Sequence, residues 1–215
     1  MRAFCLALLG ILLAGAWNPG PWFEESVPPS AEDRDRSERV HGSGAAVNVH
    51  SPPPGHTGGF GESTCQFCHL DYELNEEGGE LTLLGLPPDG FEPDSTYRLT
   101  LRLVHPELRR AGFQAAARFA SGKRRGEQAG TLVPGEGQEI QSPSYTPVSY
   151  LNHTRDGVEP TDDGRREWSF QWTVPGDLTA SVVFHVAANA ADGDDSEWGD
   201  RIYADSIVVR PAPER

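Results

Sequence analysis

Cysteine and histidine are grouped at one place in the sequence, where Cys65, Cys68 and His69 form the pattern Cys-x-x-Cys-His. Two thiols at this spacing can form thioether bonds to the two vinyl groups of one porphyrin, and the adjacent imidazole can bind the iron from one face. The pattern therefore predicts one covalently attached haem c. Cys65 and Cys68 would hold it, and His69 would be the proximal ligand of the iron.

Two other kinds of site are compatible with this pair of cysteines. They could form a small redox disulfide, but a thioredoxin-like disulfide has a βαβ context, whereas the flanking sequence here is rich in glycine. They could also bind zinc, but a structural zinc site needs four ligands and the sequence has no second cysteine pair to supply them. Both alternatives stay open, and the adjacent His69 favours the haem.

The motif leaves the second axial ligand of the iron undetermined. Met1 is the only methionine and lies in a predicted signal peptide, so a methionine ligand, the usual route to a high potential, is not expected. We consider His153, in a Tyr-x-x-His-Thr stretch, and His105, at the end of an alternating apolar stretch, as candidate distal ligands. A histidine near an apolar face is often a hydrogen-bonded structural residue, and this role stays open for both.

The remaining histidines are weaker candidates for the distal ligand, and they are His41, His50, His56 and His185. His56 is close enough to the motif in sequence to fold back on it, but little in the sequence would hold it there. His185 faces opposite to its apolar neighbours, which predicts a surface or half-buried position. A second histidine ligand would indicate electron transfer at low potential, whereas an open iron could bind a small ligand or peroxide.

The N-terminal residues predict export. Arg2 precedes an apolar run at residues 4–13, and small residues follow at 14–16, so residues 1–16 have the composition of a signal peptide. The apolar run is shorter than the ~20 residues of a membrane-spanning helix. We expect cleavage after Ala16, no membrane span in the mature chain, and a periplasmic or extracellular location. Haem c is attached outside the bacterial cytoplasm, which agrees with this expectation.

Composition divides the rest of the chain into segments. Residues 17–54 are rich in proline, glycine and charged side chains and lack an apolar stripe, which predicts a disordered linker. Residues 55–78 contain the motif and form the predicted haem-attachment segment. Residues 79–210 form the predicted folded domain, and residues 211–215 a short tail.

Strand-like patterns dominate the sequence after the motif. Apolar and polar side chains alternate, and the apolar runs are separated by Gly, Pro and Asp turns. The candidate strands are residues 81–86, 96–105, 113–119, part of 144–154, 167–174, 182–188 and 202–209. No helix of ordinary length is indicated. The predicted fold class is therefore all-β, a β-sandwich of one domain.

The charge of the chain bears on its partners. The formal net charge is −14, from 32 acidic and 18 basic side chains, which disfavours nucleic acids and anionic membranes. A basic redox protein would suit such a surface, although the sequence does not identify the redox partner or small ligand.

The acidic loop at residues 192–200 has oxygen ligands suited to calcium. Its spacing differs from that of an EF-hand, and a solvated turn is the alternative.

From about residue 55 onward, several stretches occur in the order found in one bacterial exported family. They are the glycine-rich lead into residues 64–69, Val104-His105-Pro106 with Gly112-Phe113-Gln114, Tyr150-Leu151-Asn152-His153-Thr154 with residues 168–175, and Ala187-Ala188-Asn189-Ala190 with residues 199–203. By these stretches the chain resembles the choice-of-anchor proteins with a reelin-like domain. The resemblance implies an immunoglobulin-like, reelin-type β-sandwich, placement at the envelope or cell surface, and no established enzymatic activity.

Three functions are compatible with these observations. The first is an exported monohaem c-type cytochrome-like protein on a reelin-like β-sandwich, which transfers electrons or senses redox state or a ligand. The second is an envelope adhesion or binding module in which the haem is auxiliary or absent. The third is a peroxidase-like enzyme at an open haem site. An enzymatic function is the less favoured, because the sequence carries no nucleophile elbow, phosphate loop or metalloprotease motif.

Overall fold

The computed structural model describes residues 50–213, which fold into two antiparallel β-sheets with short 3-10 turns. The predicted signal peptide and residues 17–49 of the predicted linker lie outside the described residues. For the described part of the chain, the prediction of an all-β sandwich without an ordinary helix is confirmed. A search of the same residues finds no helix that is both long and apolar enough to cross a membrane.

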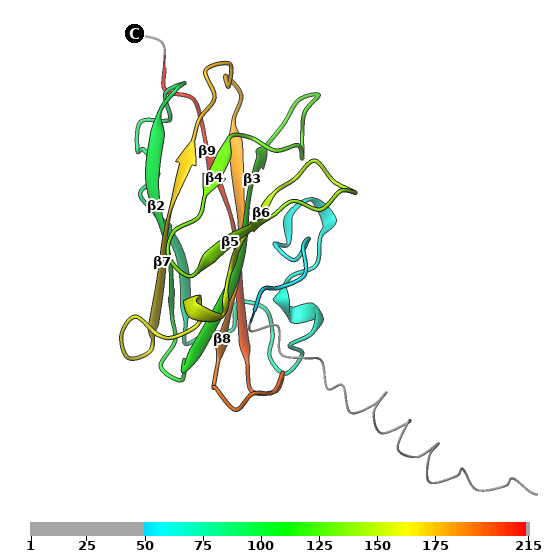
Figure 1. Cartoon of the computed structure of the whole chain (residues 1–215), viewed down its shortest axis with the longest axis vertical. Helices are drawn as coiled ribbons and strands as arrows, with labels where there is room; N and C mark the ends of the chain where they lie inside the picture. The colour runs from blue at the N-terminus through cyan, green and yellow to red at the C-terminus, as the bar shows by residue number, and fades with distance from the viewer. Residues whose placement is uncertain (1–49, 214–215) are drawn as a thin grey trace, which may run out of the picture. The chain divides into compact units, whose positions relative to one another are not determined.

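Neighbouring strands are antiparallel throughout both sheets (Figure 1). The four-stranded sheet has the order β1 (Glu80–Leu84), β2 (Thr96–Val104), β7 (Arg165–Thr173), β4 (Thr131–Val133). The five-stranded sheet has the order β5 (Gln138–Gln141), β6 (Tyr150–His153), β3 (Arg110–Phe119), β8 (Val182–Ala191), β9 (Arg201–Val209). The 3-10 turns are η1 (Gly59–Gly61), η2 (Cys65–Phe67) and η3 (Arg155–Gly157).

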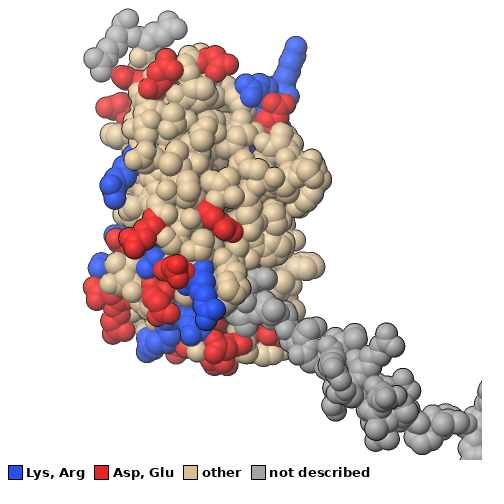
Figure 2. Space-filling view, viewed as in Figure 1, with Lys and Arg blue, Asp and Glu red and all other residues tan. Residues whose placement is uncertain are grey.

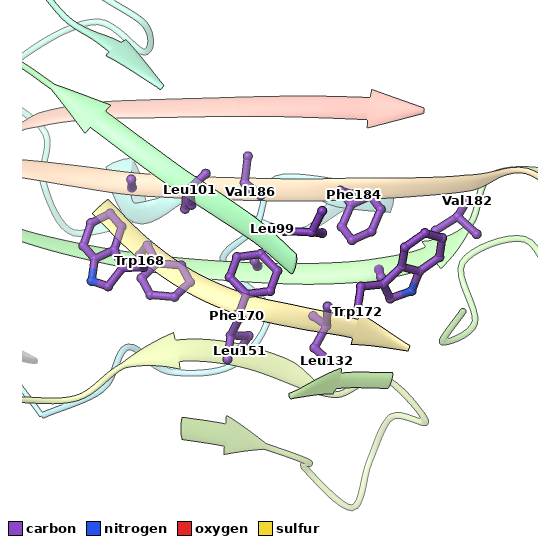
Figure 3. Close-up of a cluster of buried hydrophobic side chains, with 14 of the residues drawn as sticks. Leu99, Leu101, Leu132, Leu151, Trp168, Phe170, Trp172, Val182, Phe184 and Val186 are labelled. Carbon is purple, nitrogen blue, oxygen red and sulfur yellow. The ribbon is translucent and has the colours of Figure 1, made fainter. Parts of the chain in front are cut away.

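The core lies between the sheets and is lined by every second residue of the central strands (Figure 3). In β2, Leu99 and Leu101 are fully buried. They stand opposite Phe170 and Trp168 of β7, respectively, in the register of the first sheet. Removing each of these side chains from water contributes roughly 1.5–3 kcal/mol. The alternation seen in the sequence is therefore the pattern of a sheet with one face in the core.

The outer face of the five-stranded sheet is buried as well. Gln114, Ala116 and Ala187 point away from the core, yet none has exposed surface, because residues 50–79, the covering segment, lie along this face (Figure 1). His185 is only 7% exposed, so the prediction of a surface or half-buried position is wrong. The reason is that Phe60 of the covering segment packs against its ring, with centroids 4.9 Å apart.

A buried ion pair fastens the covering segment to the sheet. Arg118 of β3, 3% exposed, pairs with Glu62. The same carboxylate accepts hydrogen bonds from Tyr150 Oη at 2.6 Å and from Thr57 Oγ1 at 2.5 Å. Burial alone would raise the pKa of Glu62, but these hydrogen bonds and the charge of Arg118 outweigh it and hold the pKa below its ordinary value. The carboxylate therefore stays charged at neutral pH, and the segment that carries the motif is held against β3.

Candidate functional site

The motif residues start on a tight turn. Thr64 caps η2, and its Oγ1 accepts a hydrogen bond from the backbone N–H of Gln66 at 3.2 Å. The N–H groups of Cys68 and His69 both donate to the carbonyl of Cys65, each at 3.2 Å. This turn folds the pattern back on itself, and Cys65, Cys68 and His69 all line one cavity.

The cavity lies between the covering segment and one end of the five-stranded sheet. Its volume is about 830 Å³, including space open to solvent. Much of its lining is apolar, and the apolar residues are Pro52, Pro53, Ala111, Phe113, Val158 and Ala191. A largely apolar, half-open space therefore lies directly beside the two thiols.

A buried carboxylate orients His69. Its Nδ1 lies 2.8 Å from Oδ2 of Asp200, a residue with only 2% of its side chain exposed. Asn189 Nδ2 donates to the same oxygen at 2.7 Å and fixes the carboxylate in place. Nδ1–H is therefore the donor to Asp200, and Nε2 is the nitrogen left to bind another group. Histidines that bind metals are usually held by such a carboxylate on the other ring nitrogen.

The two thiols are free and are not joined as a disulfide. Burial raises the pKa of the Cys65 thiol to about 12. The Cys65 thiol is therefore protonated at neutral pH in the free protein. Within residues 50–213, no group of three or more His, Cys, Asp or Glu side chains is placed to hold a metal ion.

The structure separates the two predicted distal ligands. His153 lines the cavity, and its Nδ1 accepts a hydrogen bond from the Phe113 N–H at 2.9 Å. Its ring lies so close to Gly112 that an added Cβ there would be 2.6 Å away. His105 lies elsewhere, with its ring 6.3 Å from that of Tyr203 and outside the cavity lining. Only His153 of this pair is brought to the motif.

The sequence did not predict that Asp200 and His56 lie beside the motif. Asp200 contacts His69 across the fold, and no local pattern links it to the motif. His56, for which no fixed position was predicted, lines the cavity and donates from Nδ1 to the Pro53 carbonyl at 3.0 Å. The glycine-rich sequence around His56 suggested a loose segment. Contacts with β3, which are distant in sequence, order it instead.

The acidic loop at residues 192–200 forms one rim of the cavity. Its carboxylates are used inside the loop and by neighbours. Within the loop, Asp194 accepts from the Ser196 N–H at 2.8 Å, and Asp195 pairs with Arg110. The loop is also bonded to the covering segment, where Asp71 accepts from the Gly199 N–H at 2.7 Å.

On the face visible in Figure 2, acidic and basic side chains are interspersed, and no continuous basic patch is seen.

Comparisons with known proteins concern the fold. No protein-family model matches the chain, and none of the curated proteins matches it. Among solved structures, the chain is similar to the reeler domain of human F-spondin, with 20% identity, a TM-score of 0.42, and coverage of 64% of this chain and 94% of that one. It is also similar to the major pilin SpaD of Corynebacterium diphtheriae, with 12% identity, a TM-score of 0.36, and coverage of 60% of this chain and 35% of that one.

These similarities are too distant to assign a function. Membership of the choice-of-anchor family and haem attachment at the Cys-x-x-Cys-His motif both stay predictions.

Proposed function

We propose that this chain is an exported monohaem c-type protein that transfers electrons or senses redox state or a ligand. One observation carries the proposal. Cys65, Cys68 and His69 line a single cavity, and Asp200 holds His69 by Nδ1 so that Nε2 remains for the iron. A bound haem would supply one-electron chemistry at its iron.

The side chains around the cavity fit a covalently attached haem. Cys65 and Cys68 are free thiols at the edge of an apolar space. Thioether formation adds S–H across a vinyl double bond. The sulfur bonds to one vinyl carbon and the hydrogen goes to the other, so no oxidant is needed. Apolar residues of the covering segment and of the nearby end of the five-stranded sheet would pack against the porphyrin. A β-sandwich could in this way shield a haem without helices.

The buried carboxylate would tune the iron. A hydrogen bond from Nδ1–H of His69 to the charged Asp200 increases the basicity of Nε2, and a more basic ligand stabilises the oxidised iron. Asp200 Oδ1 and Asn189 Oδ1 are buried without a hydrogen-bond partner among residues 50–213. A carboxylate in such a place favours positive charge next to it. We therefore place the reduction potential at the low end of the range for c-type haems.

The test is to express the full chain in a bacterial host with the haem c maturation system and measure the intact mass after denaturation. The expected result is a mass increase of one haem, with no alkylatable cysteine in the mature protein. Cys65→Ser and Cys68→Ser together should abolish the increase, whereas His50→Ala, an exposed residue outside the cavity lining, should not. A mature protein with two alkylatable thiols and no added mass would overturn the proposal.

An envelope binding module is the second candidate, and one observation favours it. Large apolar side chains beside the motif are exposed, with Phe67 at 68%, Leu70 at 65% and Trp198 at 55%. Large exposed apolar side chains can belong to an interaction surface. Under this function, partner binding would be lost in Phe67→Ser and Leu70→Ser and unchanged in the double cysteine variant. Loss of binding in the cysteine variant would instead tie recognition to the haem.

A further inference from the structure

His56 lies on the covering segment and lines the same cavity as the motif. Its Nδ1 is 3.0 Å from the Pro53 carbonyl oxygen. A carbonyl only accepts hydrogen bonds, so Nδ1 carries the ring proton and Nε2 carries a lone pair. No hydrogen bond to Nε2 of His56 occurs among residues 50–213. With Nδ1 engaged in this way, Nε2 is the ring nitrogen that a metal would bind.

One buried glutamine holds the turn that carries His56. Gln114 of β3 has no exposed surface, and its Oε1 accepts from the His56 backbone N–H at 2.6 Å. Its Nε2 donates to the Pro53 carbonyl at 3.0 Å and to Asn152 Oδ1 at 2.9 Å. Both ends of the short turn are thus tied to the rigid sheet. The imidazole is positioned by its backbone rather than by its own ring contacts alone.

His153 is held by the backbone of β3. Its Nδ1 lies 2.9 Å from the Phe113 backbone nitrogen and 3.2 Å from the Phe113 carbonyl oxygen. Its ring also lies against Gly112 and is only 6% exposed. These contacts are those of a hydrogen-bonded structural histidine. The other described histidines, His50, His105 and His185, are not part of the cavity lining.

We infer that His56 is the second axial ligand, so that the iron is bound by the imidazoles of His69 and His56. The inference rests on the haem proposed above. It narrows that proposal to a six-coordinate, low-spin iron with no open position for peroxide or a small ligand. It also gives the covering segment a second connection to the iron, upstream of the motif, because His56 would bind the iron while its backbone stays bonded to Gln114 of β3.

The experiment compares the absorption and electron paramagnetic resonance spectra of the haem-loaded full chain with those of His56→Ala. The wild type is expected to be low-spin and His56→Ala predominantly high-spin, with covalent haem retained. Added imidazole should return the variant to low spin, because the anchoring hydrogen bond to Gln114 comes from the backbone and survives the substitution. His56→Met should remain six-coordinate with a raised potential, since Met/His ligation raises it. His153→Ala and His50→Ala are the matched histidine controls and should stay low-spin.

The results that would overturn the assignment of His56 differ from the result that would overturn the haem proposal. A wild type that is high-spin, or a His56→Ala protein that stays low-spin, overturns the inference and leaves the haem proposal standing. A shift to high spin in His153→Ala alone assigns the ligand to His153 and also overturns it. Absence of covalent haem in the denatured wild type removes the proposed function itself, and that result is read separately from the spin state.

Discussion

His69 Nδ1 and Asp200 Oδ2 lie 2.8 Å apart and join the Cys-x-x-Cys-His motif to the start of the last strand, β9. The contact connects two parts of the chain that no local pattern relates. It fixes which nitrogen of His69 faces the cavity, and it places a buried negative charge behind the proposed iron ligand. The first prediction follows from that charge.

Asp200→Asn should raise the reduction potential of the loaded protein. The amide keeps the size of the side chain but removes the negative charge behind His69, so the oxidised iron loses stabilisation. We expect a rise of roughly 60 mV, which for one electron corresponds to a tenfold change in the equilibrium. Potentiometric titration followed by absorption measures it. Asp205→Asn, an exposed site on β9, is the control, and equal potentials in all three proteins would contradict the role of Asp200.

Glu62→Gln should release the covering segment. The substitution leaves Arg118 charged and buried without its partner, which typically costs about 3–5 kcal/mol. We expect a comparable loss in the free energy of unfolding and faster amide hydrogen exchange across residues 56–69. Glu127→Gln breaks an exposed pair with Arg124 and should change stability by less than about 1 kcal/mol. If exchange in residues 56–69 stays slow in Glu62→Gln, the ion pair does not hold the segment.

Stability should fall as the pH falls below about 6.5. Burial, reinforced by the charge of Arg118, holds the pKa of His185 below its ordinary value of 6.5. The unfolded chain therefore binds a proton before the folded one does, and the free energy of unfolding decreases from pH 6.5 down towards the folded pKa. His105, whose pKa is also lowered by burial, contributes in the same direction. These histidines contribute little slope once the pH is more than about one unit above 6.5, because they are then deprotonated in both the folded and the unfolded chain.

His185→Gln should make this pH dependence shallower. Urea denaturation of the two proteins between pH 5 and pH 7.5 measures the slopes. His50→Gln, exposed in the structure, should retain the wild-type slope. Identical slopes for wild type and His185→Gln would show that His185 titrates normally and is not buried in the folded protein.

Gly112→Ala should displace His153 without changing the spin state of the iron. The added Cβ would lie 2.6 Å from the His153 ring, so the ring must move, and overpacking of this kind costs roughly 1–3 kcal/mol. If His56 is the ligand, the iron stays low-spin in this variant. A change to high spin would point to His153 instead.

The strands could be predicted from the sequence because each has one face in the core. Leu99, Leu101 and Leu103 alternate with polar residues over the whole of β2, and this pattern suffices to locate a strand. β4 and β5, with three and four residues, are too short for such a pattern to be visible. The exposure of His185 was predicted wrongly because alternation gives the face of a strand and cannot show that another segment covers that face.

The candidate site was predictable only as far as it is local. Cys65, Cys68 and His69 are adjacent in sequence, and their spacing carries the chemistry. Asp200 and His56 reach the site through contacts with distant strands. The position of His56 depends on a hydrogen bond to Gln114 that composition cannot reveal. Of the two histidines predicted as distal ligands, chain position alone could not tell which one lies near the motif.

The most direct measurement is the alkaline pyridine spectrum of the exported wild-type protein after denaturation, recorded in the reduced state. Denaturation removes any haem that is bound only by contacts, and the band position reports how many vinyl groups have become thioethers. The account predicts one haem per chain with both vinyl groups converted, and one remaining vinyl group in Cys65→Ser or Cys68→Ser. A wild-type spectrum without haem, or with both vinyl groups intact, would contradict it.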